Sequence, residues 1–313
     1  MIELTALTKM YGEKTAVDNL SFSVKPGTVT GFLGPNGAGK STTMRMIVGL
    51  DVPTSGRAIV NGKPYAQLKA PLREVGTLLE AKAVHTSRSA SNHLLALAAT
   101  HGFSRSRVDE VIELVGLQDV AGKRAGGFSL GMGQRLGIAA ALLGDPATVM
   151  LDEPVNGLDP EGIRWVRDLL RGLATEGRTV FVSSHLMSEM ALTADHLIVI
   201  GRGRLLADMS MNEFIEANST ASVRVTSPRA GELSTLLAGP AVIISSDATG
   251  TLEVTGLSAA QIGDRASTAG IALHELTTTR ASLEEAFMAM TGDSVEYHGS
   301  TTHDSHLTEK DAA

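Results

Sequence analysis

The sequence predicts an α/β protein in which a large domain is followed by a small α+β domain. Three observations support this prediction. A glycine-rich phosphate-loop motif at residues 34–41 stands between an apolar strand and a helix. Short apolar strands alternate with segments of helical periodicity as far as residue 218. The composition then turns small and polar, and a second series of strands and helices follows.

The first domain, residues 1–218, is called here the phosphate-loop domain. Short strands in its opening segment are expected to be broken by turns at Tyr11-Gly12 and Pro26-Gly27. Later strands are expected at Val29–Leu33, Arg57–Asn61, Val75–Leu79, Val149–Leu151 and Thr179–Val182, with a hairpin at Leu197–Ile200 and Arg204–Ala207. Helices are expected at Ser41–Leu50, Ser87–Val115, Ser129–Leu143 and Pro160–Leu173, so that residues of about 86–143 form a helical subdomain.

The second domain, residues 219–292, is expected to be a ferredoxin-like sandwich of the order βαββαβ with one further helix. Its strands are expected at Ser222–Thr226, Val242–Ser246, Leu252–Thr255 and Ile271–Thr277, and its helices at Gly231–Leu237, Ala259–Thr268 and Ser282–Met290. Residues 293–313 are polar, and we expect them to be disordered. This tail contains His298, His303 and His306, which could bind a metal. Their irregular spacing instead favours a solvated tail.

The overall composition limits the classes of function. The chain has 313 residues, no cysteine and a formal net charge of −7. The lack of cysteine removes disulfides, thiolate metal sites and cysteine nucleophiles. A net acidic chain is a poor candidate for general nucleic-acid binding, so we expect no nucleic-acid partner. No run reaches the ~18 apolar residues of a membrane span, and the N-terminus lacks a signal segment. We therefore expect no direct membrane insertion and no export.

The phosphate loop is the strongest motif in the chain. Glycines let successive backbone N–H groups face one anion, and the helix that follows adds the partial positive charge of its N-terminus. Lys40 is placed to reach the β- and γ-phosphates of a nucleotide, and the Ser41 hydroxyl to ligate Mg²⁺. The residues expected to contact the phosphates are Gly34, Pro35, Asn36, Gly37, Ala38, Gly39, Lys40, Ser41 and Thr42.

Two adjacent carboxylates form the second motif. Asp152 and Glu153 follow the buried strand that starts at Thr148. The strand aims Asp152 at the Mg²⁺ that Ser41 holds, and Glu153 is placed to act as general base for a water beside the γ-phosphate. The alternative is an ordinary acidic loop after a strand. The phosphate loop upstream favours a catalytic pair.

The segment between these motifs resembles the signature of the ATP-binding cassette (ABC) family. That signature reads Leu-Ser-Gly-Gly-Gln, and the stretch that starts at Phe128 matches it at Ser129 and Gly131. The resemblance implies an ABC-type P-loop NTPase domain with a helical subdomain. It also implies that Ser129 and Gly131 hold the γ-phosphate bound by a partner cassette. The alternative for Ser129 is a simple helix N-cap.

Further family elements occur in order along the chain. The resemblance implies that Asp159 lies in a loop that crosses the dimer interface. It implies that His185 is a switch histidine, which bonds the γ-phosphate and fixes Glu153 with its water. Tyr11 stands where the family has an aromatic side chain that stacks on adenine, although an aromatic residue in a β-turn would look the same.

One position departs from the family pattern. Where the family has a glutamine that contacts Mg²⁺ or water, this chain has Glu80, and a carboxylate is also a hard oxygen ligand. Glu80 and the altered signature resemble the drug- and bacteriocin-resistance subgroup of exporters. The resemblance is dense from residue 1 to about 215, and residues 282–287 carry only a weak echo of such subunits.

The resemblance implies the ATP-hydrolysing subunit of a two-component exporter for a drug, antibiotic or peptide-like compound. Its cofactors would be ATP and Mg²⁺. Its partners would be a second ATPase subunit, in a homodimer or pseudo-dimer, and a separate transmembrane permease that docks between Glu80 and Gly126. The protein would be cytoplasmic and peripheral on the inner face of the cell membrane.

Two other classes of protein remain as alternatives. A soluble ABC ATPase of translation or chromosome type would have two cassettes with a basic linker, or long coiled coils, and neither occurs here. A nucleotide-dependent regulator without turnover is disfavoured by the intact pair Asp152-Glu153.

Overall fold

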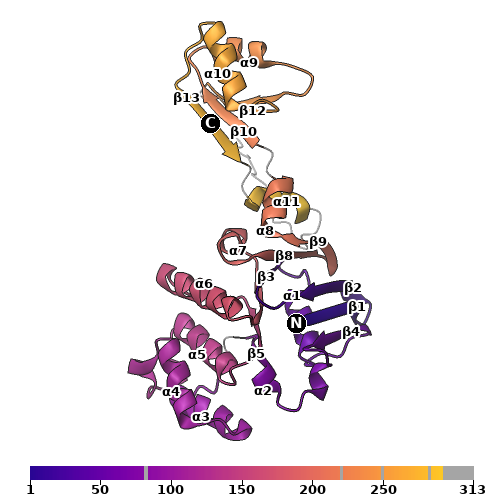
Figure 1. Cartoon of the computed structure of the whole chain (residues 1–313), viewed down its shortest axis with the longest axis vertical. Helices are drawn as coiled ribbons and strands as arrows, with labels where there is room; N and C mark the ends of the chain where they lie inside the picture. The colour runs from indigo at the N-terminus through magenta and orange to yellow at the C-terminus, as the bar shows by residue number, and fades with distance from the viewer. Residues whose placement is uncertain (81–83, 219–220, 248–249, 281–282, 292–313) are drawn as a thin grey trace, which may run out of the picture.

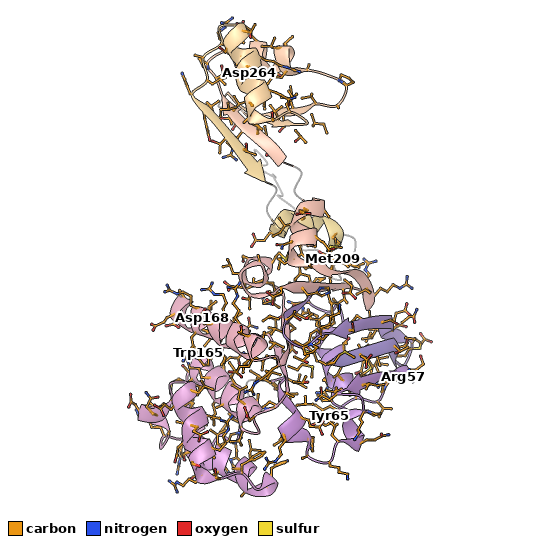
Figure 2. The ribbon with its side chains drawn as sticks, viewed as in Figure 1. Arg57, Tyr65, Trp165, Asp168, Met209 and Asp264 are labelled. Carbon is orange, nitrogen blue, oxygen red and sulfur yellow. The ribbon has the colours of Figure 1, made fainter. Side chains whose placement is uncertain are left out.

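The structure is a computed structural model, and it describes residues 1–80, 84–218, 221–247, 250–280 and 283–291 (Figure 1). The tail expected at 293–313 lies outside the described residues. Two bodies of unequal size are visible. The phosphate-loop domain fills the lower part of Figure 1, and a small sheet with two helices stands above it. Figure 2 labels Trp165 in the lower body and Asp264 in the upper one.

A six-stranded sheet forms the centre of the phosphate-loop domain, in the order β5-β6-β7-β3-β8-β9. Its strands are β3 (Val29–Leu33), β5 (Val75–Leu78), β6 (Thr148–Asp152), β7 (Thr179–Ser184), β8 (His196–Gly201) and β9 (Arg204–Ser210). All pairs are parallel except β8 with β9. The strands β3 and β7 are buried along their whole length, as expected for a parallel sheet covered on both faces. The carboxyl ends of β3, β6 and β7 therefore meet at one edge, where ligands bind in such sheets.

A three-stranded antiparallel sheet lies beside the central sheet, in the order β2-β1-β4. Its strands are β1 (Ile2–Tyr11), β2 (Lys14–Val24) and β4 (Ser55–Val60). The turns expected at Tyr11-Gly12 and Pro26-Gly27 end β1 and β2, but the strands are longer than the short ones expected, with 10 and 11 residues. Their pairing continues through several shifts of register. The core between the sheets contains Phe22, Phe32 and Phe181, whose ring centroids are 5.0–5.9 Å apart. The helix α1 (Lys40–Ile47) packs in the same cluster.

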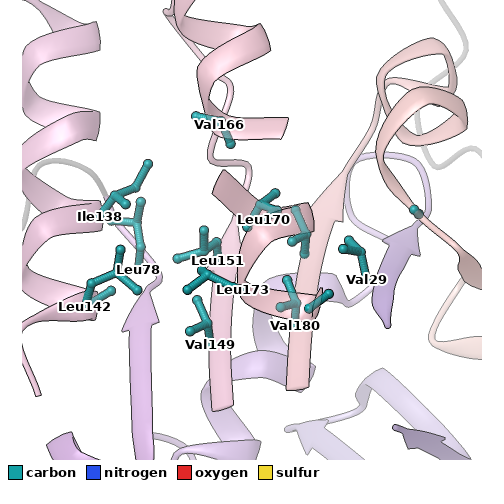
Figure 3. Packing of buried hydrophobic residues seen from close by; sticks show 14 of the residues in the cluster. Val29, Leu78, Ile138, Leu142, Val149, Leu151, Val166, Leu170, Leu173 and Val180 are labelled. Atoms are coloured by element: carbon teal, nitrogen blue, oxygen red, sulfur yellow. The ribbon is translucent and has the colours of Figure 1, made fainter. Parts of the chain in front are cut away.

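The helical subdomain contains α3 (Ala90–His101), α4 (Arg105–Leu114) and α5 (Leu130–Leu142). The helical stretch expected at 87–115 is present as two helices, because Gly102 ends α3 with a φ of +67° and Ser104 caps α4. The helix α6 (Pro160–Thr175) covers the sheet next to α5. Figure 3 shows Ile138 and Leu142 of α5 beside Leu78, and Leu170 and Leu173 of α6 over the strands. Shorter elements are α2 (Pro71–Glu74) and the 3₁₀ turns Tyr65–Gln67, Gln118–Val120 and Ala125–Gly127.

Two helices of the phosphate-loop domain were not expected from the sequence. The helix α7 (Met187–Thr193) starts directly after the strand that leads to His185, and α8 (Met211–Asn218) follows β9. Both are short and lack the long apolar periodicity by which helices are recognised. Phe214 of α8 is fully buried in the main core.

The small body is a four-stranded antiparallel sheet in the order β11-β12-β10-β13 with two helices on one face. Its elements are β10 (Ala221–Thr226), α9 (Ala230–Leu237), β11 (Ile243–Ser246), β12 (Thr251–Thr255), α10 (Ala259–Thr268) and β13 (Glu275–Arg280). Numbered within this body, the strand order is 2-3-1-4, the arrangement of the βαββαβ sandwich that the sequence predicts. The last strand begins later than expected, at Glu275, and Ile271 before it is buried in the small core.

The final described helix does not join the small sheet. The helix α11 (Leu283–Thr291) packs against α7 and α8, as Figure 1 shows. Ala286 and Phe287 are buried in the core of the phosphate-loop domain, and Met290 packs against it. The division at residues 218/219 stays a prediction. The chain leaves the phosphate-loop domain at α8, forms the small body and returns with α11.

Candidate nucleotide-binding site

The phosphate loop connects β3 to α1, and its glycines are required by close backbone contacts. A Cβ atom on Gly34 would lie 2.5 Å from the carbonyl oxygen of Ile200, and one on Gly39 would lie 2.6 Å from that of Ala16. Gly39 also has a φ of +102°, which other residues rarely adopt. The loop is thus fixed against β2 and β8, with its backbone curled at the N-terminus of α1.

Lys40 is buried beneath this loop and is 7% exposed. Its ammonium donates a hydrogen bond of 2.6 Å to the carbonyl oxygen of Gly34 and lies 3.8 Å from Oε1 of Glu153. Burial lowers the pKa of Lys40, while the charges of Glu153 and Asp152 act in the opposite direction. A bound phosphate anion would favour the protonated form of Lys40, as these two carboxylates do.

The metal-ligand candidates Ser41 and Asp152 are in direct contact. The Ser41 hydroxyl donates a hydrogen bond of 2.6 Å to Oδ2 of Asp152, and Ser183 donates one to Oδ1. A hydroxyl and a carboxylate are hard oxygen donors of the kind that Mg²⁺ takes, together with nucleotide phosphates. Within the described ranges no group of three acidic or histidine side chains could hold a metal by itself. The donor set therefore fits an ion that arrives with a nucleotide.

Glu153 and His185 form a hydrogen-bonded pair. Nδ1 of His185 lies 2.8 Å from Oε2 of Glu153, and the carboxylate accepts. Glu153 has a φ of +50°, a strained value for a residue with a side chain. Its backbone is held there by two bonds: its N–H donates to Ser183 at 3.0 Å, and its carbonyl accepts from Gln134 at 2.8 Å. Gln134 comes from α5 and Ser183 from β7, and neither was assigned a role from the sequence.

Tyr11 lies at the end of β1 and is 49% exposed. Its hydroxyl donates a hydrogen bond of 3.1 Å to Asp51, and the Lys9 ammonium lies 4.9 Å from the ring centroid. Asp51 in turn accepts a bond of 2.8 Å from Arg45. These contacts fix the ring while leaving half of it accessible for stacking on a base.

One cavity of about 900 Å³ connects Tyr11 to the phosphate loop. Its walls contain residues 35–42 of the loop and Glu153, and it also contains residues that the sequence analysis missed: Lys14, Thr15, Ala16 and Arg202. The first three follow Tyr11 closely in the sequence, and this position could have indicated that they contact the same ligand. Arg202 comes from the distant β8–β9 turn and has no local sequence signal for this role.

The signature residues lie elsewhere. Ser129 caps α5 by accepting from the N–H of Met132 at 3.2 Å, and Asp159 caps α6 by accepting from Gly162 at 2.9 Å. A Cβ atom on Gly131 would lie 3.0 Å from the carbonyl oxygen of Gly157. The signature and the Asp159 loop therefore pack together, but none of these residues lines the cavity around the phosphate loop.

Glu80 lines a second cavity of about 330 Å³. Ser41 and Asp152 line the same cavity, which places Glu80 near the metal-ligand candidates. The opposite wall includes His93 of α3, which is buried and whose Nδ1 has no hydrogen-bond partner within the described part of the chain. Burial lowers the pKa of His93. His93 was not singled out in the sequence.

Two families match the chain. Residues 17–156 match a family described as ABC transporter, and residues 221–284 match a domain of unknown function. A bacitracin transport ATP-binding protein from Bacillus licheniformis is 45% identical over 221 residues, which are 70% of this chain and 72% of that protein. An uncharacterised ABC transporter ATP-binding protein from Bacillus subtilis is 37% identical over 303 residues, covering 95% and 97% of the two chains.

A solved structure of an ATP-binding cassette has a similar fold. It is a dimeric ATP-binding cassette in a post-hydrolysis state with ADP and Pi bound, 25% identical with a TM-score of 0.62, covering 67% of this chain and 99% of that one. No helix among the described residues has the length and apolar character needed to cross a membrane. The phosphate loop, the carboxylate pair with its histidine and the match to these relatives lead to one conclusion: the chain belongs to the ATP-binding proteins of the ABC transporter family.

Proposed function

We propose that this ATPase powers export through a separate membrane protein and uses Mg-ATP as its fuel. One observation carries the ATPase assignment. Lys40, Ser41, Asp152 and the Glu153–His185 pair meet at one edge of the central sheet, beside a cavity large enough for a nucleotide. The similarity to bacitracin and lantibiotic transport ATP-binding proteins supports the transport assignment.

Each side chain has a distinct task in this proposal. Ser41 and Asp152 would hold Mg²⁺, which neutralises phosphate charge when bound. Lys40 binds the β- and γ-phosphates and stabilises the charge that develops on them. Glu153 takes the proton of the attacking water, and His185 orients its carboxylate through the 2.8 Å hydrogen bond.

The signature residues complete the site of a second subunit. Ser129, Gly131 and Asp159 do not line the cavity of their own chain, so we infer that they face the nucleotide held by a partner cassette. The exposed start of α5 offers backbone N–H groups to an anion there. Hydrolysis then requires a dimer, either of two copies or of this chain with a similar one.

The permease is proposed to dock on the face between Glu80 and Gly126. This face contains a cavity of about 800 Å³, whose lining includes Thr86, Lys123, Arg124 and Phe128. The lining combines the apolar side chains of Val120, Phe128 and Met132 with the cations of Lys123 and Arg124, which suits an amphipathic cytoplasmic segment. The protein would then be cytoplasmic and bound to the inner face of the membrane. The bacitracin transport relative supports an antibiotic or peptide-like substrate.

Co-purification tests this proposal. The genes next to that of this chain are searched for one that encodes a protein with several apolar spans. The two proteins are then expressed together, extracted in detergent and reconstituted in lipid. We expect a stable complex whose ATPase activity rises when the transported compound is added. Robust ATPase activity in the free chain, with no association and no stimulation, would instead support a soluble non-transport ATPase.

A further inference from the structure

The turn between β8 and β9 has an unusual composition for its geometry. Gly201 pairs with Arg204, which leaves Arg202 and Gly203 as a two-residue turn. Both have a positive φ, +46° and +78°. Turns of this kind favour asparagine or aspartate followed by glycine, because a long side chain is strained at positive φ. Arginine at the first position is therefore retained at a cost to the turn.

This turn is fixed directly onto the phosphate loop. The N–H of Gly203 donates a hydrogen bond of 3.0 Å to the carbonyl oxygen of Ala38, and the backbone N–H of Asp18 donates one of 2.8 Å to the carbonyl oxygen of Gly203. A Cβ atom on Gly203 would lie 2.8 Å from the carbonyl oxygen of Ala16. These contacts thus fix the position of the Arg202 backbone relative to the phosphate loop.

Arg202 lines the nucleotide cavity and is exposed to it. Its guanidinium forms no hydrogen bond or ion pair with any residue in the part of the chain that the structure describes. The neighbouring Arg204 differs in both respects, because it donates a hydrogen bond of 2.8 Å to Asp18 and does not line the cavity. An unpaired guanidinium in the wall of an anion site is a ready phosphate ligand.

We propose that Arg202 is a nucleotide-binding residue that contacts the α-phosphate. Tyr11 marks the adenine end of the cavity, and Lys40 with Ser41 marks the end of the β- and γ-phosphates. The turn contacts this cavity wall at Ala38, two residues before Lys40, and at Ala16, five residues after Tyr11. We therefore place Arg202 between the two ends. This inference rests on the nucleotide site proposed above. Because ATP and ADP share the α-phosphate, Arg202 stabilises both to the same extent.

The test compares three variants of the full chain. Arg202→Asn removes the guanidinium and supplies the residue that this turn favours. Arg202→Lys keeps the charge. Arg204→Gln is the matched control on the same hairpin. Equilibrium Kd values are measured by calorimetry for Mg-ADP and for a non-hydrolysable ATP analogue with Mg²⁺, and thermal unfolding gives Tm.

We expect Arg202→Asn to weaken the binding of both nucleotides by about three- to tenfold, the range for one charged contact near the surface. Its Tm should equal or exceed that of the wild type, since the turn is improved. Arg202→Lys should recover most of the affinity, and Arg204→Gln should bind like the wild type.

Three results would overturn the inference: wild-type affinity in Arg202→Asn, a loss confined to the ATP analogue, or an equal loss in Arg204→Gln. The second would move the contact to the γ-phosphate, and the third would assign the effect to the hairpin as a whole. Lys40→Ala separates this inference from the site itself. If Lys40→Ala also binds both nucleotides normally, the proposed nucleotide site is wrong. If it loses binding while Arg202→Asn does not, only the role of Arg202 is wrong.

Discussion

Lys40 is the residue on which phosphate binding depends most directly. Its buried ammonium is surrounded by the carbonyl oxygen of Gly34 and the carboxylate of Glu153. Lys40→Ala removes one charged hydrogen bond, which contributes about 1.5–3 kcal/mol. We expect ATPase activity to be lost and nucleotide affinity to fall by roughly tenfold to a hundredfold. Calorimetry with Mg-ADP checks the affinity, with the exposed Lys25→Ala as control. Full turnover in Lys40→Ala would contradict the phosphate-loop assignment.

Tyr11 provides a test of adenine binding. Tyr11→Ala should raise the KM for ATP several-fold and change kcat little, because stacking stabilises ground and transition states equally. Tyr11→Phe is the matched control, since it keeps the ring and loses only the hydrogen bond to Asp51. Steady-state kinetics of the wild type, Tyr11→Ala and Tyr11→Phe measure KM and kcat for this comparison. Identical kinetics in Tyr11→Ala and wild type would leave Tyr11 as a turn residue.

The residues that could be predicted from the sequence are those inside short patterns. Lys40, Ser41 and Asp152 lie in motifs whose spacing is set by one turn or one strand end, and the structure brings them together. Gln134 and Ser183 are different, because they bind the backbone of Glu153 from the separate elements α5 and β7. That contact depends on how separate elements pack, so no local pattern reveals it.

At the scale of elements, α11 is the part of the molecule that most changes the interpretation of the sequence. It follows the ferredoxin-like strands in the chain but packs on α7, the helix directly after His185. Phe287→Ala should leave a cavity and lower the free energy of unfolding by about 3 kcal/mol. Met288→Ala, on the exposed side of the same helix, should change it by less than about 0.5 kcal/mol.

Urea-induced unfolding monitored by circular dichroism provides this comparison. Equal midpoints for Phe287→Ala and Met288→Ala would show that α11 does not share the core of the phosphate-loop domain. A lower midpoint for Phe287→Ala alone supports the packing seen here.

Elements with clear apolar patterns were predicted well, and short helices were not. The strand Val29–Leu33 and the helix that starts at Pro160 have clear apolar patterns and start signals, and both occur as predicted. The helices α7 and α8 have seven and eight residues. They are stabilised by tertiary contacts with the sheet and α11, which no window of sequence records.

For the whole molecule, the return of α11 predicts how the chain can be shortened. Deleting residues 219–313 removes α11 and uncovers the apolar surface of α7 and α8. We expect this truncated chain to bind nucleotide, because the site lies within residues 11–202, but to unfold at a lower temperature. Replacing residues 221–280 with a Gly/Ser linker retains α11 and should restore most of the lost Tm. Equal Tm values for the two shortened chains would contradict this account.

Two copies of this site, each completed by the signature of the other, are proposed to hydrolyse Mg-ATP with Glu153 as base. Glu153→Gln tests this claim most directly, measured by light scattering and phosphate release in the presence of Mg-ATP. We predict a dimer that retains ATP and hydrolyses it about 10²–10⁴-fold more slowly than wild type, as for a lost general base. A Glu153→Gln protein that stays monomeric and turns over ATP at the wild-type rate would contradict the claim.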